Sequence, residues 1–260
     1  MPNSSYMELE TIPWLNAVDH RASTASTNDL ALSEALAEGD GWAWLFVADE
    51  QTAGRGRRGN AWWAGSGALT FSLVIDAAKR GIDPAQWPLF PLATGLAVRD
   101  TIGAELPDES VLVKWPNDVY LNGRKAAGIL VEQRRDHGHQ LVIGVGINVN
   151  TEMNAAPDLL PDCAISLRQV SSRSHELSEV LVDFLLRFDE RLRQVVYDAS
   201  RLLAELNDCS HLTGRRVRLD AGGRQIWGHC RGIAENGGLL LATADGMQTF
   251  VGGTVGAVEE

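Results

Sequence analysis

The chain has 260 residues, a net charge of −11 and 45% apolar residues. This composition predicts a folded globular protein and excludes the disordered, collagen-like and coiled-coil classes. No apolar run approaches the roughly 18 residues that cross a bilayer. The first residues lack the basic and apolar regions of a signal peptide. The negative charge disfavours binding to nucleic acid and to anionic lipid. We therefore expect a cytoplasmic protein that binds neither membranes nor DNA.

The first 206 residues are predicted to mix apolar strands with helices. The Ser-Thr-Asn-Asp sequence at 26–29 is typical of a helix cap, and the helix that it begins is predicted to end at Gly39. Segments rich in β-branched and aromatic residues predict strands at 44–49, 68–76, 111–115, 119–121, 128–132 and 141–149. The spacing of apolar residues predicts helices at 89–102, 177–192 and 197–206. The Asn122-Gly123 step favours a type I′ turn between neighbouring strands, because both residues tolerate positive φ.

The chain changes character after Asn207. Short strands are predicted at 215–219, 225–234, 239–243 and 248–251, separated by glycine-rich turns. This pattern predicts a small all-β module of about 50 residues, too small to be very stable alone, which we expect to dock on the rest of the protein.

A glycine-rich segment with three arginines, 54–59, is unusual in so acidic a chain. Its Gly-Arg-Gly-Arg-Arg-Gly sequence formally matches the dinucleotide-binding fingerprint, but that mechanism needs a helix to begin at the third glycine, and a strand follows instead. A solvated flexible loop is the plain alternative. Because three cations on four residues repel one another unless an anion joins them, we favour an anion-binding loop.

Three other polar segments have ordinary structural explanations when taken singly. Lys-Trp-Pro-Asn-Asp at 114–118 is compatible with a simple turn after a strand, and the cations at 124–125 with a charged hairpin tip. Ser26, Thr27 and Asn28 are compatible with a helix cap, although their hydroxyls and amide could equally bind a polar ligand.

The sequence gives no sign of a metal site held by protein side chains alone. Its six histidines lack metal-ligand spacing, and its three cysteines are dispersed without a Cys-x-x-Cys pair. An odd, dispersed set of cysteines suits a reducing compartment and argues against a disulfide framework.

Taken together and in order, these segments resemble the bacterial biotin protein ligases (biotin–[acetyl-CoA-carboxylase] ligases). The matching stretches are STNDLA at 26–31, EQTAGRGRRG at 50–59, KWPNDVYLNGRKAAGILVE at 114–132 and GVGINVN at 144–150. The resemblance implies an α+β fold. Residues 1–208 would form a class II aminoacyl-tRNA synthetase-like catalytic domain with a mixed sheet and flanking helices, and 209–260 a small SH3-like β-barrel.

The resemblance also implies a reaction and a set of site residues. ATP, with Mg²⁺ as its counter-ion, and biotin would give biotinyl-5′-AMP, and a lysine of a biotin carboxyl carrier protein would then take the biotin. Arg57 and Lys125 would be catalytic. The biotin-binding residues would be Ser26, Thr27, Asn28, Gln51, Arg55, Gly56, Arg57 and Lys125. The loop over the adenylate would include Arg58, Gly59 and Trp62, and the ATP-binding residues would be Asn117, Asp118 and Arg231.

The sequence departs from the family pattern in two places. Asn60-Ala61 replaces the further basic residue or glycine that usually precedes the tryptophan, and about 25 residues precede Ser26, which leads us to expect no DNA-binding domain there. A lipoate–protein ligase on the same scaffold and a non-catalytic sensor of biotin or its adenylate remain alternatives. The oligomeric state, including a homodimer, is left open.

Overall fold

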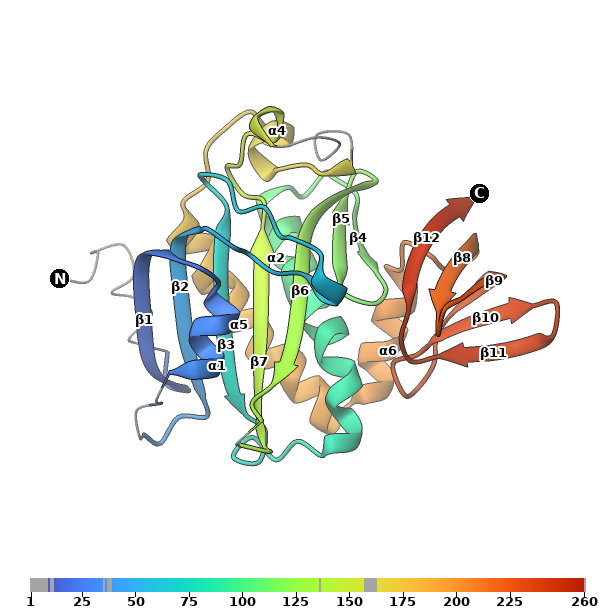
Figure 1. The fold of residues 1–260 in the computed structure, drawn as a ribbon, viewed down its shortest axis with the longest axis horizontal. Helices are drawn as coiled ribbons and strands as arrows, with labels where there is room; N and C mark the ends of the chain where they lie inside the picture. The colour runs from blue at the N-terminus through green and yellow to red at the C-terminus, as the bar shows by residue number, and fades with distance from the viewer. Residues whose placement is uncertain are drawn as a thin grey trace.

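The fold is organised around a seven-stranded sheet, shown face-on in Figure 1. The structure is a computed structural model, and it describes residues 9, 12–34, 36, 39–135, 137–156 and 163–259. The strand order is β1-β2-β3-β7-β6-β5-β4. The bounds are β1 Leu15–Thr24, β2 Ala43–Gln51, β3 Leu69–Asp76, β4 Val111–Lys114, β5 Asp118–Leu121, β6 Arg124–Gln133 and β7 Gln140–Ile147. β1 and β2 are parallel and all other neighbours are antiparallel, so the sheet is mixed.

The two faces of this sheet have different environments. The odd-numbered side chains of β3 enter the main core with helices α2 (Phe90–Glu105) and α5 (Leu177–Tyr197), where Phe71 packs 5.0 Å from Phe184 between ring centroids. The even-numbered ones face short helix α1 (Thr27–Ser33), which packs on Val74. Figure 1 shows α1 on the near face and α2 and α5 behind the sheet. Because α1 covers only part of its face, the rest is left for a cavity.

A second sheet of five antiparallel strands follows helix α6 (Ala199–Asp208). Its order is β11-β10-β9-β8-β12. The bounds are β8 Arg216–Ala221, β9 Arg224–Ile233, β10 Leu239–Thr243, β11 Gly246–Phe250 and β12 Thr254–Glu259.

The two sheets are joined by a shared apolar core. Leu96 of α2 and Leu206 of α6 belong to the same buried cluster as Leu219 and Leu241 of the second sheet. Trp115 is also in this cluster, and its indole Nε1 donates a 3.0 Å hydrogen bond to the Gly237 carbonyl. The expectation that the small β module docks on the rest of the chain is therefore confirmed.

The remaining elements are short. They are the 3₁₀ helices η2 Arg57–Gly59, η3 Pro84–Leu89 and η4 Met153–Ala155, and helix α4 Leu167–Ser171. Among the described residues, no helix is both long and apolar enough to cross a membrane.

The predicted α+β class, with a mixed sheet and a small C-terminal β module, is confirmed, but several elements differ. The first helix was predicted to end at Gly39 and instead ends at Ser33, because Arg134 donates hydrogen bonds to the carbonyls of Ala31 and Glu34 and so satisfies its last turn. Strands β1 and β12 and helix α4 were not predicted. The Asn122-Gly123 turn has the predicted positive φ at both residues.

Candidate active site

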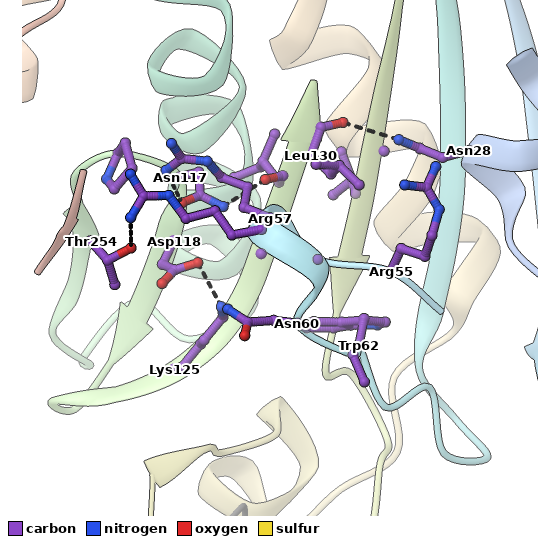
Figure 2. A pocket seen from close by; sticks show the side chains of 18 of the residues that line it. Asn28, Arg55, Arg57, Asn60, Trp62, Asn117, Asp118, Lys125, Leu130 and Thr254 are labelled. Carbon is purple, nitrogen blue, oxygen red and sulfur yellow. Dashed lines mark hydrogen bonds and ion pairs between the residues drawn. The ribbon is translucent and has the colours of Figure 1, made fainter. Parts of the chain in front are cut away.

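A cavity of about 160 Å³ lies on the α1 face of the large sheet. Its walls come from the start of α1, the arginine loop (residues 54–62), the 114–118 turn, and residues 253–255 of the C-terminal module. Figure 2 shows Arg55, Arg57, Asn117, Asp118 and Lys125 converging on it. The four polar segments of the sequence thus meet in one place, although each alone has an ordinary structural explanation.

Glycines form the floor of the cavity. Gly144 and Gly146 of β7 lie opposite Ser72 and Thr70 of β3, where alternation directs side chains towards α1. A Cβ at Gly144 would come within 2.0 Å of Asn28 Oδ1, and one at Gly146 within 2.4 Å of the Trp62 ring. The close packing of both side chains on the sheet therefore requires glycine at these positions.

The start of α1 presents hydroxyl and amide groups beside this floor. Ser26 is the N-cap and accepts from the Asp29 backbone N–H, as the capping pattern predicts. Gln51 Oε1 accepts a 2.7 Å hydrogen bond from Thr27 N, and Ser72 Oγ lies 2.8 Å from Thr27 Oγ1. Since Gln51 uses its oxygen internally, its amide nitrogen is left with no hydrogen-bond partner in the described part of the chain and can donate to a ligand.

Asn28 is engaged inside the protein more fully than the sequence suggested. Its Oδ1 accepts a 2.6 Å hydrogen bond from Ser72 Oγ, while its Nδ2 donates to Glu132 Oε2 at 2.8 Å and to the Leu130 carbonyl at 3.3 Å. Both amide N–H groups and the oxygen of this 3% exposed side chain thus bond to the protein. Asn28 lines the cavity, and in this structure it orders the wall.

Arg55 is also held by protein carboxylates. Its guanidinium contacts Glu132 at 3.1 and 2.8 Å and Asp29 Oδ1 at 2.6 Å, and the hydrogen-bonded Glu132 raises the pKa of Arg55 against the opposing effect of burial. Its expected role of supplying charge to reactants stays a prediction, since here the charge is already matched. Sequence reasoning missed Glu132 and Asp29. The period-2 alternation along β6 put Glu132 on the same face as Gly128, which was the available signal.

Arg57 differs from Arg55 in having no carboxylate partner among the described residues. Its Nη1 donates to Asn117 Oδ1 at 3.2 Å, and Asn117 Nδ2 donates in turn to the Ile129 carbonyl at 2.7 Å. Burial, and next the charge of Arg58, lowers the pKa of Arg57 from its ordinary value. The nearby charge of Asp118 opposes this lowering without forming an ion pair, so Arg57 is a half-buried cation whose charge no ion pair of the described chain matches.

Lys125 lies across the cavity from Arg57 (Figure 2). Its Nζ is 2.6 Å from Asp118 Oδ1 and 5.7 Å from the centroid of the Trp62 ring. A register shift between Val119 and Tyr120 brings Lys125 opposite Tyr120 and so onto this face of the sheet.

Lys114 is a cavity residue that the sequence analysis did not single out as functional. It ends β4 directly opposite Asp118, and its Nζ donates a 2.9 Å hydrogen bond to Tyr120 Oη. Burial lowers the pKa of Lys114, and burial raises the pKa of Tyr120 to about 12. The signal that could have found Lys114 is its register with Asp118, which gives the two side chains the same face.

The arginine loop contacts the C-terminal module through Arg58. This residue has left-handed backbone angles, φ 57° and ψ 31°, and its Nη1 donates to Thr254 Oγ1 at 2.9 Å. Trp62 follows, with its ring over Gly146 and its buried Nε1 without a hydrogen-bond partner in the described structure. The loop is thus folded over the cavity floor.

The structure brings most of the expected site residues together. Those that line the cavity are Ser26, Thr27, Asn28, Gln51, Arg55, Gly56, Arg57, Arg58, Trp62, Asn117, Asp118 and Lys125. Gly59 lies in the loop with φ +79° but is not part of the lining, and Arg231 is an exposed residue of β9 that does not line it either.

The cavity contains one carboxylate among its lining residues, that of Asp118. No group of three or more His, Cys, Asp or Glu side chains suited to a metal ion occurs among the residues that the structure describes. One carboxylate beside an amide fits Mg²⁺ that arrives with a nucleotide, because protein-bound Mg²⁺ commonly combines one or two carboxylates with substrate phosphates.

Two family models match the chain. Residues 21–148 match the biotin/lipoate A/B protein ligase family, and residues 212–255 match the biotin protein ligase C-terminal domain. The first covers the whole arginine loop and the 114–118 turn, and the second covers most of the second sheet.

Individual relatives agree with these models. A biotin–[acetyl-CoA-carboxylase] ligase of Mycobacterium tuberculosis is 33% identical over 86% of this chain and 82% of its own length. The bifunctional ligase/repressor BirA of Bacillus spizizenii is 35% identical over 78% of this chain, which spans 63% of that relative's length. Among solved structures, a biotin protein ligase from Aquifex aeolicus in complex with biotin and ATP has a TM-score of 0.79 and 27% identity, covering 94% of this chain and 99% of that one.

Proposed function

The chain belongs to the biotin protein ligase family, and on that premise we propose that it activates biotin with ATP and transfers it to a protein lysine. The first step gives biotinyl-5′-AMP and pyrophosphate, and the second gives biotinylated biotin carboxyl carrier protein and AMP. The observation that carries the proposal is one cavity in which Arg57 and Lys125 face each other beside the polar start of α1.

The first step must bring two anions together. A biotin carboxylate oxygen attacks the α-phosphorus of ATP, and the two groups repel unless cations lie between them. Arg57 has no carboxylate partner among the described residues, and Lys125 can exchange Asp118 for a substrate anion. These two side chains stabilise the charge on the α-phosphate. Asp118 and Asn117 would hold Mg²⁺ that arrives with ATP, and that ion would supply further positive charge to the phosphates.

The other end of the cavity suits the ring of biotin. Its ureido group has one carbonyl acceptor and two N–H donors. Ser26 and Thr27 carry hydroxyls that donate or accept, and the Gln51 amide nitrogen donates. Asn28 holds the wall on which this recognition depends.

The arginine loop protects the product of the first step. A mixed anhydride hydrolyses if water reaches it, and a covered site retains it. Trp62 lies over the glycine floor and Arg58 ties the loop to Thr254, so the cover is made by two segments distant in sequence. In the second step a neutral acceptor amine attacks the acyl carbon, AMP leaves with the electron pair of the broken C–O bond, and the amine nitrogen releases one proton to solvent as the amide forms.

Transfer to an acceptor domain tests the proposal directly. The protein is incubated with ATP, biotin and the acceptor domain of a biotin carboxyl carrier protein, and the intact mass of the acceptor is measured. We expect one biotinyl group per acceptor, with none when ATP is omitted or the acceptor lysine is replaced by arginine. Biotin binding without any mass increase would favour a sensor over a ligase.

A lipoate–protein ligase is the second candidate, because the first family model covers both activities. The match of residues 212–255 to the C-terminal domain of biotin protein ligases favours biotin. Pyrophosphate exchange measured separately with biotin and with lipoate decides between them, and exchange with lipoate alone would overturn our assignment.

DNA binding does not form part of the proposal. Some relatives are named ligase/repressors, but this chain has a net charge of −11, which disfavours contact with phosphates. Specific retention of DNA by this protein in a gel-shift assay would contradict this part of the proposal.

A further inference from the structure

Five cations line the cavity, and their partners differ. They are Arg55, Arg57, Arg58, Lys114 and Lys125. Arg55 is paired with two carboxylates, Lys125 with one, and Arg58 with a threonine hydroxyl. Arg57 and Lys114 have neutral partners, the Asn117 amide and the Tyr120 hydroxyl. Lys114 is therefore a half-buried cavity cation that interacts with the charge of Asp118 but forms no ion pair with a carboxylate of the described chain, and the proposed function gives it no role.

The contacts of Lys114 hold it in one direction. Its Nζ is 2.9 Å from Tyr120 Oη and 4.7 Å from the centroid of that ring, and the ring stacks on His211 at 4.7 Å. Placing a charge in a fixed position before the substrate arrives reduces the cost of reorganisation during the reaction. Tyr120 therefore acts as a positioning group for the ammonium.

Sheet order places Lys114 at one end of the substrate path. The cavity runs from Gly144 on β7, beside α1, past Lys125 on β6 and Asp118 on β5 to Lys114 on β4. Neighbouring strands are about 4.8 Å apart, so β4 lies about 10 Å beyond β6, the strand that carries Lys125. In phosphoryl and nucleotidyl transfer the attacking and leaving oxygens are roughly in line. If the biotin ring is held at α1, the leaving group departs towards β4.

From this arrangement we propose that Lys114 binds the β- and γ-phosphates of ATP and stabilises the departing pyrophosphate, with Tyr120 as its positioning residue. The inference rests on the proposed function. A carboxylate oxygen of biotin forms the new bond to the α-phosphorus, and the bond from that phosphorus to the α,β-bridging oxygen breaks. The electron pair stays on that oxygen, which becomes part of pyrophosphate beside Lys114. No proton moves, and the five negative charges of biotin and ATP are shared between biotinyl-5′-AMP and pyrophosphate.

Measuring adenylate formation and biotin transfer separately distinguishes a phosphate-binding role of Lys114 from a structural one. Lys114→Met keeps most of the side-chain length and removes the charge. We expect its biotin-dependent pyrophosphate exchange to fall about 100-fold, the usual effect of losing one aimed charge in a reaction site. Transfer from synthetic biotinyl-5′-AMP to the acceptor domain should stay within threefold of wild type, because that substrate has no β- or γ-phosphate. Lys79→Met, at an exposed lysine outside the cavity, is the matched control and should match wild type in both assays.

Tyr120→Phe tests the positioning residue without removing a charge. It deletes the hydroxyl that holds Nζ and keeps the ring that stacks on His211. We expect KM for ATP to rise several-fold, with KM for biotin and the transfer half-reaction unchanged. This variant also provides the test if Lys114→Met does not fold.

The outcomes that overturn the inference are specific. Equal losses in exchange and transfer would indicate a structural role for Lys114, and wild-type exchange in Lys114→Met would remove it from the phosphate path. Unchanged KM for ATP in Tyr120→Phe would overturn the positioning role. If the wild-type protein itself lacks biotin-dependent exchange, the proposed function fails instead, so the two failures are distinguishable.

Discussion

Arg58 donates a 2.9 Å hydrogen bond to Thr254, a residue 196 positions further along the chain. The same guanidinium lies 3.5 Å from the Asp220 carbonyl, so the arginine loop is tied to two strands of the C-terminal sheet. Residues 253–255 line the cavity beside this contact. The C-terminal module is therefore part of the site wall, and its position and that of the loop depend on each other.

Replacing Thr254 by valine should loosen the loop with little change of shape. The variant loses the hydroxyl that accepts from Arg58, a contact we expect to contribute about 0.5–1.5 kcal/mol. Enzyme-bound biotinyl-5′-AMP should therefore dissociate or hydrolyse about 2- to 10-fold faster. Its loss is measured by adding an excess of unlabelled ligand to the labelled complex. Thr254→Ser keeps the hydroxyl and should behave as wild type. Equal retention times in all three proteins would show that this contact does not hold the loop closed.

Arg57→Ala and Lys125→Ala should each reduce adenylate formation by about 100-fold or more, because each removes a cation aimed at developing charge. Biotin-dependent pyrophosphate exchange measures this step. Arg224→Ala, at an exposed arginine of the C-terminal sheet, is a suitable control. Exchange close to that of wild type in either cavity variant would remove that residue from the reaction.

Much of the fold could be predicted because its core strands carry a strong local signal. β3 is buried over seven of its eight residues and is continuously rich in β-formers, so its position was correct to one residue. β1 has no buried residue, and its exposed and half-buried positions do not alternate strictly. Its strand conformation depends on pairing with β2, which local sequence does not encode. The C-terminal limit of α1 depended likewise on Arg134, a hundred residues away.

The site was predicted as a set of residues but not as a set of roles. Three arginines in one loop appeared equivalent in the sequence, yet the structure gives Arg55 two carboxylates, Arg57 an amide and Arg58 a threonine. These differences arise from segments 26 to 196 residues away. Partners at that distance cannot be inferred from spacing along a single chain, which is also why Glu132 was missed.

Glu132 should affect biotin recognition through Arg55 and Asn28. Glu132→Gln removes the negative charge that pairs with Arg55 and weakens the acceptor for Asn28. We expect KM for biotin to rise about 5- to 10-fold while KM for ATP stays near wild type, in steady-state assays of adenylate formation. Glu152→Gln, at a largely exposed carboxylate, is the matched control. A similar rise in both KM values would indicate general disruption of the site.

Gly146→Ala should displace Trp62 from the cavity floor. The added Cβ would lie 2.4 Å from the indole ring, a separation that the structure can relieve only by moving one of them. We expect altered tryptophan fluorescence in the free protein and a fall in adenylate formation of about tenfold or more, because a misplaced site residue reduces the fraction of productive complexes. Gly103→Ala in α2 meets no atom within 4 Å and should instead stabilise the fold by up to about 1 kcal/mol. Unchanged fluorescence in Gly146→Ala would show that Trp62 does not rest on this strand in solution.

His211 should make the fold sensitive to mild acid. Burial lowers the pKa of His211 to about 4, and the charges of Arg215 and Lys114 act in the same direction. In the unfolded chain His211 takes up a proton near pH 6.5, whereas in the folded protein it stays neutral until about pH 4. Unfolding is therefore favoured as the pH falls from 6.5 to 4. The full difference between the two pKa values corresponds to about 3 kcal/mol. His211→Phe retains a ring to stack on Tyr120 and removes the titration. Urea unfolding at pH 7 and pH 4.5 should therefore show a smaller loss of stability in the variant than in wild type, and equal losses in the two proteins would contradict the burial of a neutral imidazole at this position.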